Sequence, residues 1–408
     1  MKRIPYTSRR KFIAQSASAI GFPTIVPSSV FGQNAPSNKI TMAVLGWGMM
    51  GPGNTGKFLN ETDCQIVAAC DIDKGNLQKA LNTINGSYKN TDCKGYHDYR
   101  EVMARQDLDT VMIAIPDNWH ALVSIEAAKN GKDIYGEKPL ARTIAEQRAI
   151  VRAVQKYQRI WQTGSWQRSE NNFRIGAEIV RNGLIGKLTH VEVGLPSGHN
   201  DFAKTGDKRS VTPPPADLDY EMWLGPASVQ DYIECRIHKN WRWDYNIGGG
   251  QLLDWIGHHC DIAHWGMDMD SSGPSEVNPI QVDMPPRTDI WNTATKYRAE
   301  AKYAGDITMT IAGGHDDIKM GTKWIGTDGW VHVNRGSYDA SKDSLKKIVK
   351  KRESDKPDAK VIESSAAPKL GDDMIKTRLY ETAGHHRNFL DCVKSRKPTV
   401  TPVETAHR

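Results

Sequence analysis

The stretch that decides the fold runs from Lys39 to Gly53 and reads KITMAVLGWGMMGPG. Its first half is a short apolar run with β-branched residues, which predicts a buried strand. The glycines Gly46, Gly48 and Gly51 follow directly, and Pro52 opens a helix-like stretch. A strand that turns through three spaced glycines into a helix is the first unit of a βαβ fold.

Each glycine has its own physical task in such a loop. Gly46 allows the tight turn, Gly48 lets a pyrophosphate approach the backbone, and Gly51 lets helix and strand pack closely. Met49 and Met50 belong to the same loop, where unpaired N–H groups at the helix N-terminus face the phosphates. The pattern predicts a dinucleotide-binding site.

The acidic residue after the second strand selects the nucleotide. That strand, QIVAACD, ends at Asp71, twenty residues after Gly51. A carboxylate at this place accepts hydrogen bonds from ribose hydroxyls and repels a 2′-phosphate. We therefore expect NAD as the cofactor, with NADP disfavoured.

Strand and helix patterns continue to alternate over residues 39–164. The segments are KGYHDYREVMA, TVMIAIPDNWH, HALVSIEAAKNG, DIYGEKPLA, TIAEQRAIVRAVQKY and IWQTG. This alternation predicts an α/β class domain, a doubly wound parallel sheet of the Rossmann type. Ligands bind at the carboxyl ends of such strands, where Asp71, Pro116 and Lys138 are expected.

Strands predominate in the remaining residues, 165–408. They are KLTHVEVGLP, EVNPIQVDMP, ATKYRAEAKYA, DITMTIAGG and KMGTKWIGTDGWVHVNRG. Several alternate with period two, as in an antiparallel sheet with one solvated face. We expect an α+β domain built on a large, open, mainly antiparallel sheet.

A second informative stretch, GGGQLLDWIGHHCDIAHW, runs from Gly248 to Trp265. On a helix, Asp254, His258 and Asp261 share one face, whereas His259 points about 100° away. The face is a catalytic site, a metal site or a buried polar helix. An Asp-x-x-x-His pair supplies only two ligands, so we expect no metal and favour catalysis.

These motifs, in this order, resemble the glucose-fructose oxidoreductase / inositol dehydrogenase / rhizopine catabolism (Gfo/Idh/MocA) family over nearly all of residues 39–408. The Glu-Lys-Pro tripeptide at 137–139 is the most specific mark. The resemblance implies that Lys138 lies between nicotinamide and substrate. It also implies that Pro116 and His120 lie along the cofactor, and that Glu137 supports this site.

The resemblance extends to the second domain. It implies that Asp254 and His258 act in catalysis with Lys138, and that the large sheet mediates homo-oligomerisation and substrate binding. One position departs from the family motif. Glycine is usual two residues after the Asp, whereas this chain has Ile256 there and Gly257 next.

These residues predict the oxidation of a secondary alcohol. His258 takes the hydroxyl proton, Asp254 orients the imidazole, and Lys138 stabilises the developing alkoxide. NAD accepts the hydride. Aromatic and hydrogen-bonding residues near the motif favour a sugar or glycoside. The substrate-side candidates are Trp166, Arg168, Trp241, Trp243 and Asp261.

Two other functions stay open at this point. In a redox-neutral glycoside hydrolase, a glycoside is oxidised, its aglycone is eliminated and the product is reduced again. In a different class, the chain is a non-catalytic NAD-bound sensor or scaffold. The combination of Lys138, Asp254 and His258 argues against the second alternative.

The first 33 residues form a separate segment. Ser8-Arg9-Arg10-Lys11-Phe12-Ile13 and the small residues that follow are similar to a twin-arginine export signal. We expect a periplasmic enzyme that holds NAD tightly, because free NAD is scarce outside the cytoplasm.

The same segment carries most of the net charge. It holds five basic and no acidic residues, which leaves 49 basic against 48 acidic residues in the rest of the chain. A near-neutral remainder gives no electrostatic reason to expect a nucleic-acid partner. We expect no membrane span, since no later apolar run is long enough.

Overall fold

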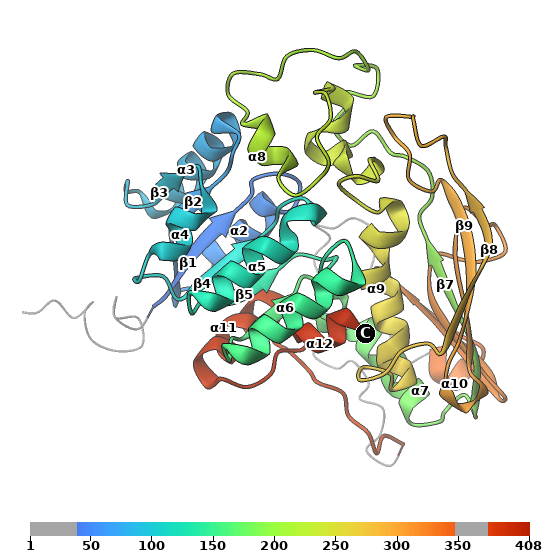
Figure 1. The fold of residues 1–408 in the computed structure, drawn as a ribbon. Helices are drawn as coiled ribbons and strands as arrows, with labels where there is room; N and C mark the ends of the chain where they lie inside the picture. The colour runs from blue at the N-terminus through green and yellow to red at the C-terminus, as the bar shows by residue number, and fades with distance from the viewer. Residues whose placement is uncertain (1–38, 347–373) are drawn as a thin grey trace, which may run out of the picture. The chain divides into compact units, whose positions relative to one another are not determined.

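The computed structural model describes residues 39–346 and 374–408, so the predicted export signal over 1–33 lies outside the described residues. The first sheet is parallel throughout. Its strand order is β3 (Lys94–Tyr96), β2 (Cys64–Cys70), β1 (Ile40–Leu45), β4 (Thr110–Ile113), β5 (Asp133–Gly136) and β6 (Trp161–Thr163) (Figure 1). This order is that of a doubly wound Rossmann sheet, so the fold prediction for this half is confirmed.

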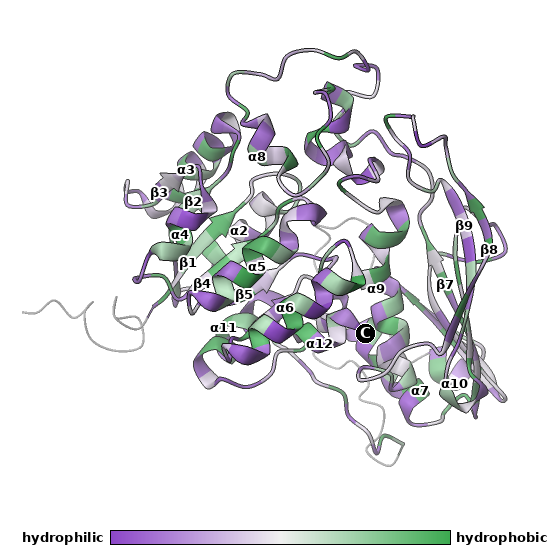
Figure 2. Cartoon of the chain, in the orientation of Figure 1, coloured by the Kyte–Doolittle hydropathy of each residue, from purple (hydrophilic) through white to green (hydrophobic). Residues whose placement is uncertain are grey.

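Helices cover both faces of this sheet. They are α2 (Gly51–Leu59), α3 (Lys74–Tyr88), α4 (Tyr99–Ala104), α5 (His120–Lys129) and α6 (Ile144–Lys156). Alternate residues of β1 point to opposite faces: Met42 packs with α2 and α3, and Ala43 packs with α4, α5 and α6. Because both faces are buried, the central strands are hydrophobic along their length (Figure 2).

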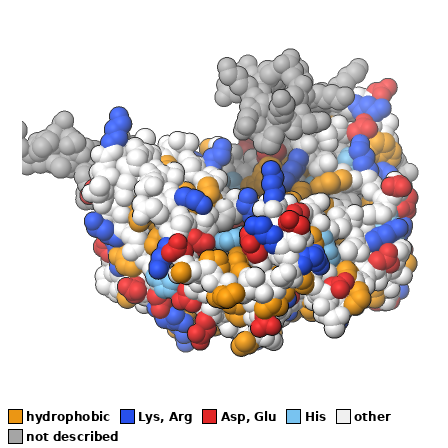
Figure 3. Space-filling model, turned by 90° about the horizontal axis from the view of Figure 1, so that it is seen from above, with side chains coloured by type: hydrophobic (Ala, Val, Ile, Leu, Met, Phe, Trp, Pro, Cys, Tyr) orange, Lys and Arg blue, Asp and Glu red, His pale blue; other side chains and the backbone are white. Residues whose placement is uncertain are grey.

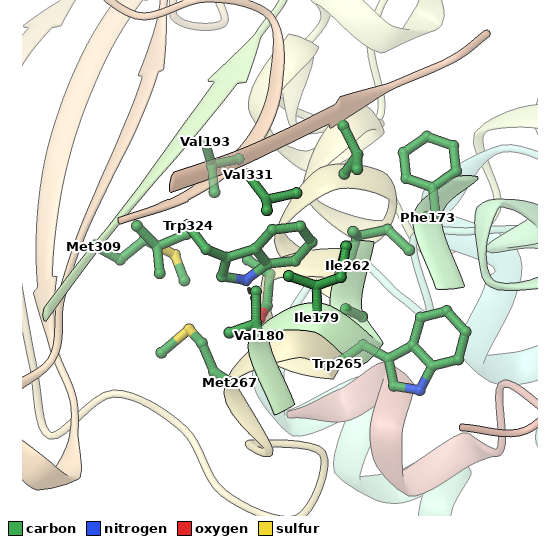
Figure 4. Packing of buried hydrophobic residues seen from close by; sticks show 14 of the residues in the cluster. Phe173, Ile179, Val180, Val193, Ile262, Trp265, Met267, Met309, Trp324 and Val331 are labelled. Atoms are coloured by element: carbon green, nitrogen blue, oxygen red, sulfur yellow. Dashed lines mark hydrogen bonds between the residues drawn. The ribbon is translucent and has the colours of Figure 1, made fainter. Parts of the chain in front are cut away.

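The second sheet is mixed and mostly antiparallel, as the strand patterns predict. Its order is β13 (Ser337–Ala340), β12 (Gly329–Asn334), β11 (Gly321–Gly326), β7 (Leu188–Leu195), β10 (Thr308–Gly313), β9 (Lys296–Lys302) and β8 (Glu276–Asp283). Only β7 and β10 pair in parallel. The helices α7 (Asn171–Arg181) and α9 (Gly250–Met267) pack against it through Ile179, Ile262 and Trp324 (Figure 4).

The C-terminal residues differ from the expected division at residue 165. Helices α11 (His385–Ser395) and α12 (Val403–His407) return to the first sheet. Phe389 of α11 packs with α2, and Val403 of α12 packs with α6 and β6. The apolar faces of these two helices therefore complete the core of the Rossmann domain.

Three further features concern the cysteines, the length of the apolar helices and the surface charge. All six cysteines are buried, and none forms a disulfide. Among the described residues, no helix is long and apolar enough to cross a membrane. Basic and acidic side chains are interspersed on the face that Figure 3 shows.

Candidate active site

The glycine-rich loop between β1 and α2 has the shape that its sequence predicts. Gly46 has φ +90°, and a Cβ there would lie 2.3 Å from the carbonyl oxygen of Ala114. A Cβ on Gly51 would lie 2.1 Å from the carbonyl oxygen of Gly46. A Cβ on Gly48 would meet no atom within 4 Å. The first and third glycines are thus required by the protein itself, whereas the second leaves open space for a ligand.

Asp71 lies just beyond the carboxyl end of β2 and faces this loop. Its Oδ2 accepts the Trp47 N–H at 2.7 Å, and its Oδ1 accepts the Asp73 N–H at 2.9 Å. Burial raises the pKa of Asp71 to about 6, so the carboxylate is mostly ionised at neutral pH. Two backbone bonds fix its orientation, and each oxygen keeps a lone pair for a ribose hydroxyl.

A cleft of about 1120 Å³, counting space open to solvent, runs along the ends of these strands. It is lined by the glycine loop, Asp71, Pro116, Glu137 and Lys138. An open loop at a helix N-terminus and a fixed carboxylate in one cleft fit the pyrophosphate and adenosine ribose of NAD.

Residues 217–244, here called the crossing segment, extend from the second domain over this cleft. The segment includes α8 (Tyr220–Leu224) and a short 3₁₀ helix, η6 (His238–Trp243). Met222, Trp223 and Trp241 are among the side chains that it contributes to the cleft lining.

Hydrogen bonds fasten the crossing segment to the Rossmann domain. The Lys74 N–H donates to the carbonyl of Asp217 at 2.9 Å. Asn118 Nδ2 donates to the carbonyl of Leu224 at 2.9 Å, and Trp119 Nε1 donates to that of Met222 at 3.0 Å. Both ends of α8 are therefore fixed, and the segment covers the predicted cofactor site.

Lys138 and Asp254 meet at the junction of the two domains. The Lys138 Nζ lies 2.9 Å from Asp254 Oδ1, and Arg242 Nε lies 3.1 Å from the same oxygen. Burial favours the neutral acid, but the two cations outweigh it and lower the pKa of Asp254 to about 2. A permanently ionised carboxylate thus holds a lysine and an arginine side by side.

His258 lies one turn after Asp254 on α9, between the indoles of Trp255 and Trp166. Its side chain is buried, and its Nδ1 has no hydrogen-bond partner among the described residues. Burial, together with the charges of Lys138 and Arg335, holds the pKa of His258 well below its usual range. The imidazole is therefore neutral and able to accept a proton.

The expected contact between Asp254 and His258 is not formed. The carboxylate turns toward Lys138 and Arg242, because two neighbouring cations attract it more strongly than a neutral imidazole. In this geometry Asp254 positions Lys138, and His258 is positioned by aromatic packing.

Gly257, which directly follows the position where the helix departs from the family motif, faces Lys138. A Cβ on Gly257 would lie 3.2 Å from the Cβ of Lys138, and the Gly257 carbonyl accepts the Ser165 hydroxyl at 2.6 Å. The glycine one position later therefore still lets α9 pack closely on the lysine.

Glu137 lies in the wall of the cleft, and His120 is buried near it without lining the cleft. Glu137 Oε1 accepts Asn54 Nδ2 at 2.7 Å, and burial raises its pKa. His120 lies with Nδ1 2.6 Å from the Pro139 carbonyl and Nε2 2.9 Å from the Ile115 carbonyl. Both residues form hydrogen bonds that connect neighbouring segments around the site, as expected for residues that support the site.

Two substrate-side candidates lie in an ion-pair network instead of the cleft. Arg168 Nε donates to Asp261 Oδ2 at 2.8 Å, and its NH2 group donates to Asp270 Oδ1 at 2.7 Å. The guanidinium is 2% exposed and also lies over Trp265. Each charge has a partner within the protein, so this geometry favours a structural role for Arg168 and Asp261.

The predicted tryptophans separate into two groups. Trp243 is fully buried, and its Nε1 donates to the Asn200 carbonyl at 2.8 Å, so it belongs to the core. Trp241 lines the cleft, and Trp166 contacts His258. These last two remain candidates for substrate contact.

Two residues near the site escaped the sequence analysis. Asp117 lines the cleft, and burial together with the charge of Asp254 raises its pKa to about 7. The sequence feature that could have marked Asp117 is its position directly after Pro116, near the end of a strand. Arg335, in the turn between β12 and β13, lies against Trp166 and Trp255, and no sequence motif marks it.

Within residues 39–346 and 374–408, no three His, Cys, Asp or Glu side chains are grouped to hold a metal ion.

Family models match both halves of the chain. The model of the NAD-binding Rossmann fold of the Gfo/Idh/MocA oxidoreductases matches residues 40–165, and that of their C-terminal alpha/beta domain matches residues 172–390. The chain belongs to the Gfo/Idh/MocA oxidoreductase family. The predictions of an oxidoreductase family and of an NAD-binding domain are thereby confirmed.

Curated relatives match over part of the chain. A glycosyl hydrolase family 109 protein 2 of Shewanella sp. (strain ANA-3) is 32% identical over 187 residues, 44% of this chain and 40% of that protein. An inositol 2-dehydrogenase of Salmonella typhimurium (strain LT2) is 30% identical over 146 residues, 35% of this chain and 42% of that protein. The chain thus spans about two fifths of the length of the curated relatives it matches.

Solved structures share the fold over most of the chain. The WlbA dehydrogenase from Bordetella pertussis, in complex with NADH and UDP-GlcNAcA, has a TM-score of 0.61 at 16% identity. The match covers 91% of this chain and 92% of that one. An aldose-aldose oxidoreductase from Caulobacter crescentus has a TM-score of 0.60 at 15% identity, covering 90% and 93%.

Proposed function

We propose that this chain is an NAD-dependent oxidoreductase that acts on a secondary hydroxyl of a sugar or glycoside. The observation that carries the proposal is the ion pair of Lys138, which lines the cleft that fits NAD, with Asp254, one helical turn before a neutral His258. A scaffold or sensor has no need of a buried lysine–aspartate pair near a histidine whose Nδ1 has no hydrogen-bond partner among the described residues. The pairing therefore favours an enzyme.

The chain's own groups divide the work of the reaction. His258 accepts the hydroxyl proton, since its imidazole is neutral. The Lys138 ammonium, fixed by Asp254, stabilises the negative charge that develops on the substrate oxygen. Arg242 adds a second cation to the same carboxylate. NAD, when bound, supplies the hydride acceptor.

The crossing segment supports tight retention of the cofactor. It contributes to the cleft lining and is hydrogen-bonded to both Ile72–Lys74 and Asn118–Trp119. Release of NAD would require these bonds to open. We propose that NAD stays bound through successive turnovers.

Retention suits an exported protein. We propose that the chain is periplasmic and is carried there by the twin-arginine pathway, which transports folded proteins with the cofactor in place. Fractionation of cells that express the chain tests this: wild type is expected in the periplasm and an Arg9→Lys/Arg10→Lys variant in the cytoplasm. The same distribution of wild type and variant between periplasm and cytoplasm would contradict twin-arginine export.

A second candidate is the redox-neutral glycoside hydrolase. The relatives described as glycosyl hydrolase family 109 proteins favour it, as does a cofactor that is not released. A ring ketone formed by oxidation acidifies the adjacent C–H, which allows a base to remove that proton as the aglycone leaves. Water then adds, and the ketone is reduced again with no net change in NAD.

One experiment tests the proposal and separates the candidates. The purified protein is analysed for bound nucleotide by mass spectrometry and then incubated with a glycoside panel. NADH that persists until a carbonyl acceptor is added supports the oxidoreductase. Free sugar and aglycone without net NADH identify the hydrolase. Bound NAD that no glycoside reduces, together with no product, would contradict both.

We also propose a homo-oligomer that forms through the second sheet. The edge strand β8 exposes Val277, Ile280 and Val282, which are 48 to 57% accessible. Light scattering of the purified protein tests this, and a monomer at micromolar concentration would contradict it.

A further inference from the structure

Arg335 occupies an unusual place beside the proposed base. It lies in the turn between β12 and β13, and Asn172 Nδ2 donates to the carbonyls on both sides of that turn, those of Asn334 and Ser337. The Arg335 guanidinium carbon lies 4.7 Å from the ring centre of Trp166 and 4.4 Å from that of Trp255. Two indoles and a fixed turn thus hold one cation in place.

The charge of Arg335 is poorly compensated. Its Nε is buried and has no hydrogen-bond partner in the described part of the chain, and no described carboxylate lies within 4.0 Å. Burial lowers its pKa, and the more distant Glu170 and Asp254 do not restore it. Cation–π contacts stabilise the guanidinium but leave its buried Nε–H without an acceptor in the described part of the chain.

The same two indoles also contact His258. The ring centre of His258 lies 6.3 Å from that of Trp166 and 5.4 Å from that of Trp255. The charge of Arg335 is among the causes of the lowered pKa of His258. A sugar that delivers a hydroxyl to His258 would therefore have another substituent within reach of Arg335.

We propose that Arg335 binds a carboxylate carried by the sugar, so that the preferred substrate is a uronic acid or its glycoside. Because indoles flank the guanidinium, its N–H groups are offered in its own plane, which suits a planar, bidentate carboxylate. A carboxylate also supplies the missing counter-charge. The inference rests on the proposed function, since it assigns the substrate class of that site.

The experiment compares each neutral pyranoside with its matching uronate, for example a methyl glucoside with the methyl glucuronide. Wild type is expected to reduce bound NAD with at least tenfold higher kcat/KM on the uronate. Arg335→Gln removes a charge that acts on His258 with either sugar, so the diagnostic quantity is the ratio of kcat/KM for the uronate to kcat/KM for the neutral sugar, which is expected to fall by roughly 10- to 100-fold. Arg335→Lys keeps the charge without the planar guanidinium. Its kcat/KM for the uronate is expected to lie between those of wild type and Arg335→Gln.

Arg298→Gln is the matched control, because Arg298 pairs with the exposed Asp317 and neither residue lines the cleft. It is expected to retain the wild-type preference. Equal losses on both sugars in Arg335→Gln, or a wild-type preference for neutral sugars, would overturn the inference.

A binding measurement separates this inference from the proposed function. Calorimetry with glucuronate and glucose on the NAD-loaded protein reports binding even without turnover. Binding of glucuronate by wild type but not by Arg335→Gln supports the carboxylate site, even if no sugar reduces NAD and the proposed function fails. Failure of glucuronate to bind more tightly than glucose would overturn the carboxylate site alone.

Discussion

The ammonium group of Lys138 lies 2.7 Å from the carbonyl oxygen of Asp254 and 2.9 Å from its Oδ1. One residue of α9 thus binds the lysine of the Rossmann domain through both its backbone and its side chain. The pair is buried, with side-chain exposures of 8% and 14%. This ion pair connects the Rossmann domain, which fits NAD, to helix α9, which carries His258.

Asp254→Asn is expected to remove both activity and stability. The substitution leaves Lys138 and Arg242 without their shared counter-ion, and breaking a buried pair costs about 3–5 kcal/mol. We expect kcat to fall at least about 100-fold, because the lysine is no longer held in position. Urea unfolding and steady-state kinetics measure the two effects. Asp317→Asn, at an exposed pair, is the control, and a similar loss there would contradict the account.

The glycine loop offers a matched pair of substitutions. Gly46→Ala is expected to destabilise the fold by more than about 2 kcal/mol, because its φ is +90° and its Cβ would strike Ala114. Gly48→Ala is expected to change the unfolding free energy by less than about 0.5 kcal/mol, since its surroundings are open. It should nevertheless weaken NAD binding at least tenfold, about 1.4 kcal/mol, in a fluorescence titration. Unchanged NAD affinity in a folded Gly48→Ala would mean that the pyrophosphate lies elsewhere.

Acid is expected to destabilise the fold below pH 6.5. Burial lowers the pKa of several histidines to about 3 or 4, namely His259, His264, His332, His385 and His386. Between that value and 6.5 the unfolded chain binds more protons, so stability falls as pH falls, by up to about 1.4 kcal/mol per pH unit for each histidine. Asp71 and Asp117, with raised pKa values of about 6 and 7, act in the opposite direction.

Because five histidines outnumber these two carboxyls, the net effect is a loss of stability in acid. Urea unfolding at pH 7, 6 and 5 measures it. A free energy of unfolding that rises toward pH 5 would contradict the assigned burial of the histidines.

Asn118→Ala is expected to speed the release of NAD. The change removes a buried hydrogen bond from the Rossmann domain to the Leu224 carbonyl of the crossing segment. A loss of about 1 kcal/mol corresponds to roughly a fivefold faster dissociation, measurable by stopped-flow displacement. Asn130→Ala, where the amide bonds only within α5, serves as the control. Equal release rates in the two variants would show that the crossing segment does not retain the cofactor.

The local motifs could be predicted from the sequence, since they depend on residues close together in the chain. Gly46, Gly48 and Gly51 lie in one short loop, and Asp71 directly follows the adjacent strand, so spacing alone indicated their arrangement. The alternation of apolar residues likewise predicted both sheets. That Lys138 and Asp254, 116 residues apart, belong to one site was expected only through the resemblance to a family, and their direct ion pair was not predicted.

Other features depend on tertiary packing that no local pattern records. Arg168 and Asp261 looked like polar substrate contacts, but Asp270 completes an ion-pair network around the arginine. Arg335 reaches the site from a β-turn more than 70 residues beyond Asp254. The crossing segment has little regular structure, and hydrogen bonds to Asn118 and Trp119 place it over the cleft.

The reduction of bound NAD by a sugar or glycoside, compared between wild type and His258→Ala, tests the central claim most directly. Both proteins are first shown to carry NAD, and NADH absorbance is then followed after the sugar is added. We predict rapid NADH formation in wild type and a rate lower by roughly 100- to 10,000-fold in His258→Ala, with NAD still bound. Equal rates in the two proteins would contradict the assignment of His258 as the base and, with it, the site built around Lys138 and Asp254.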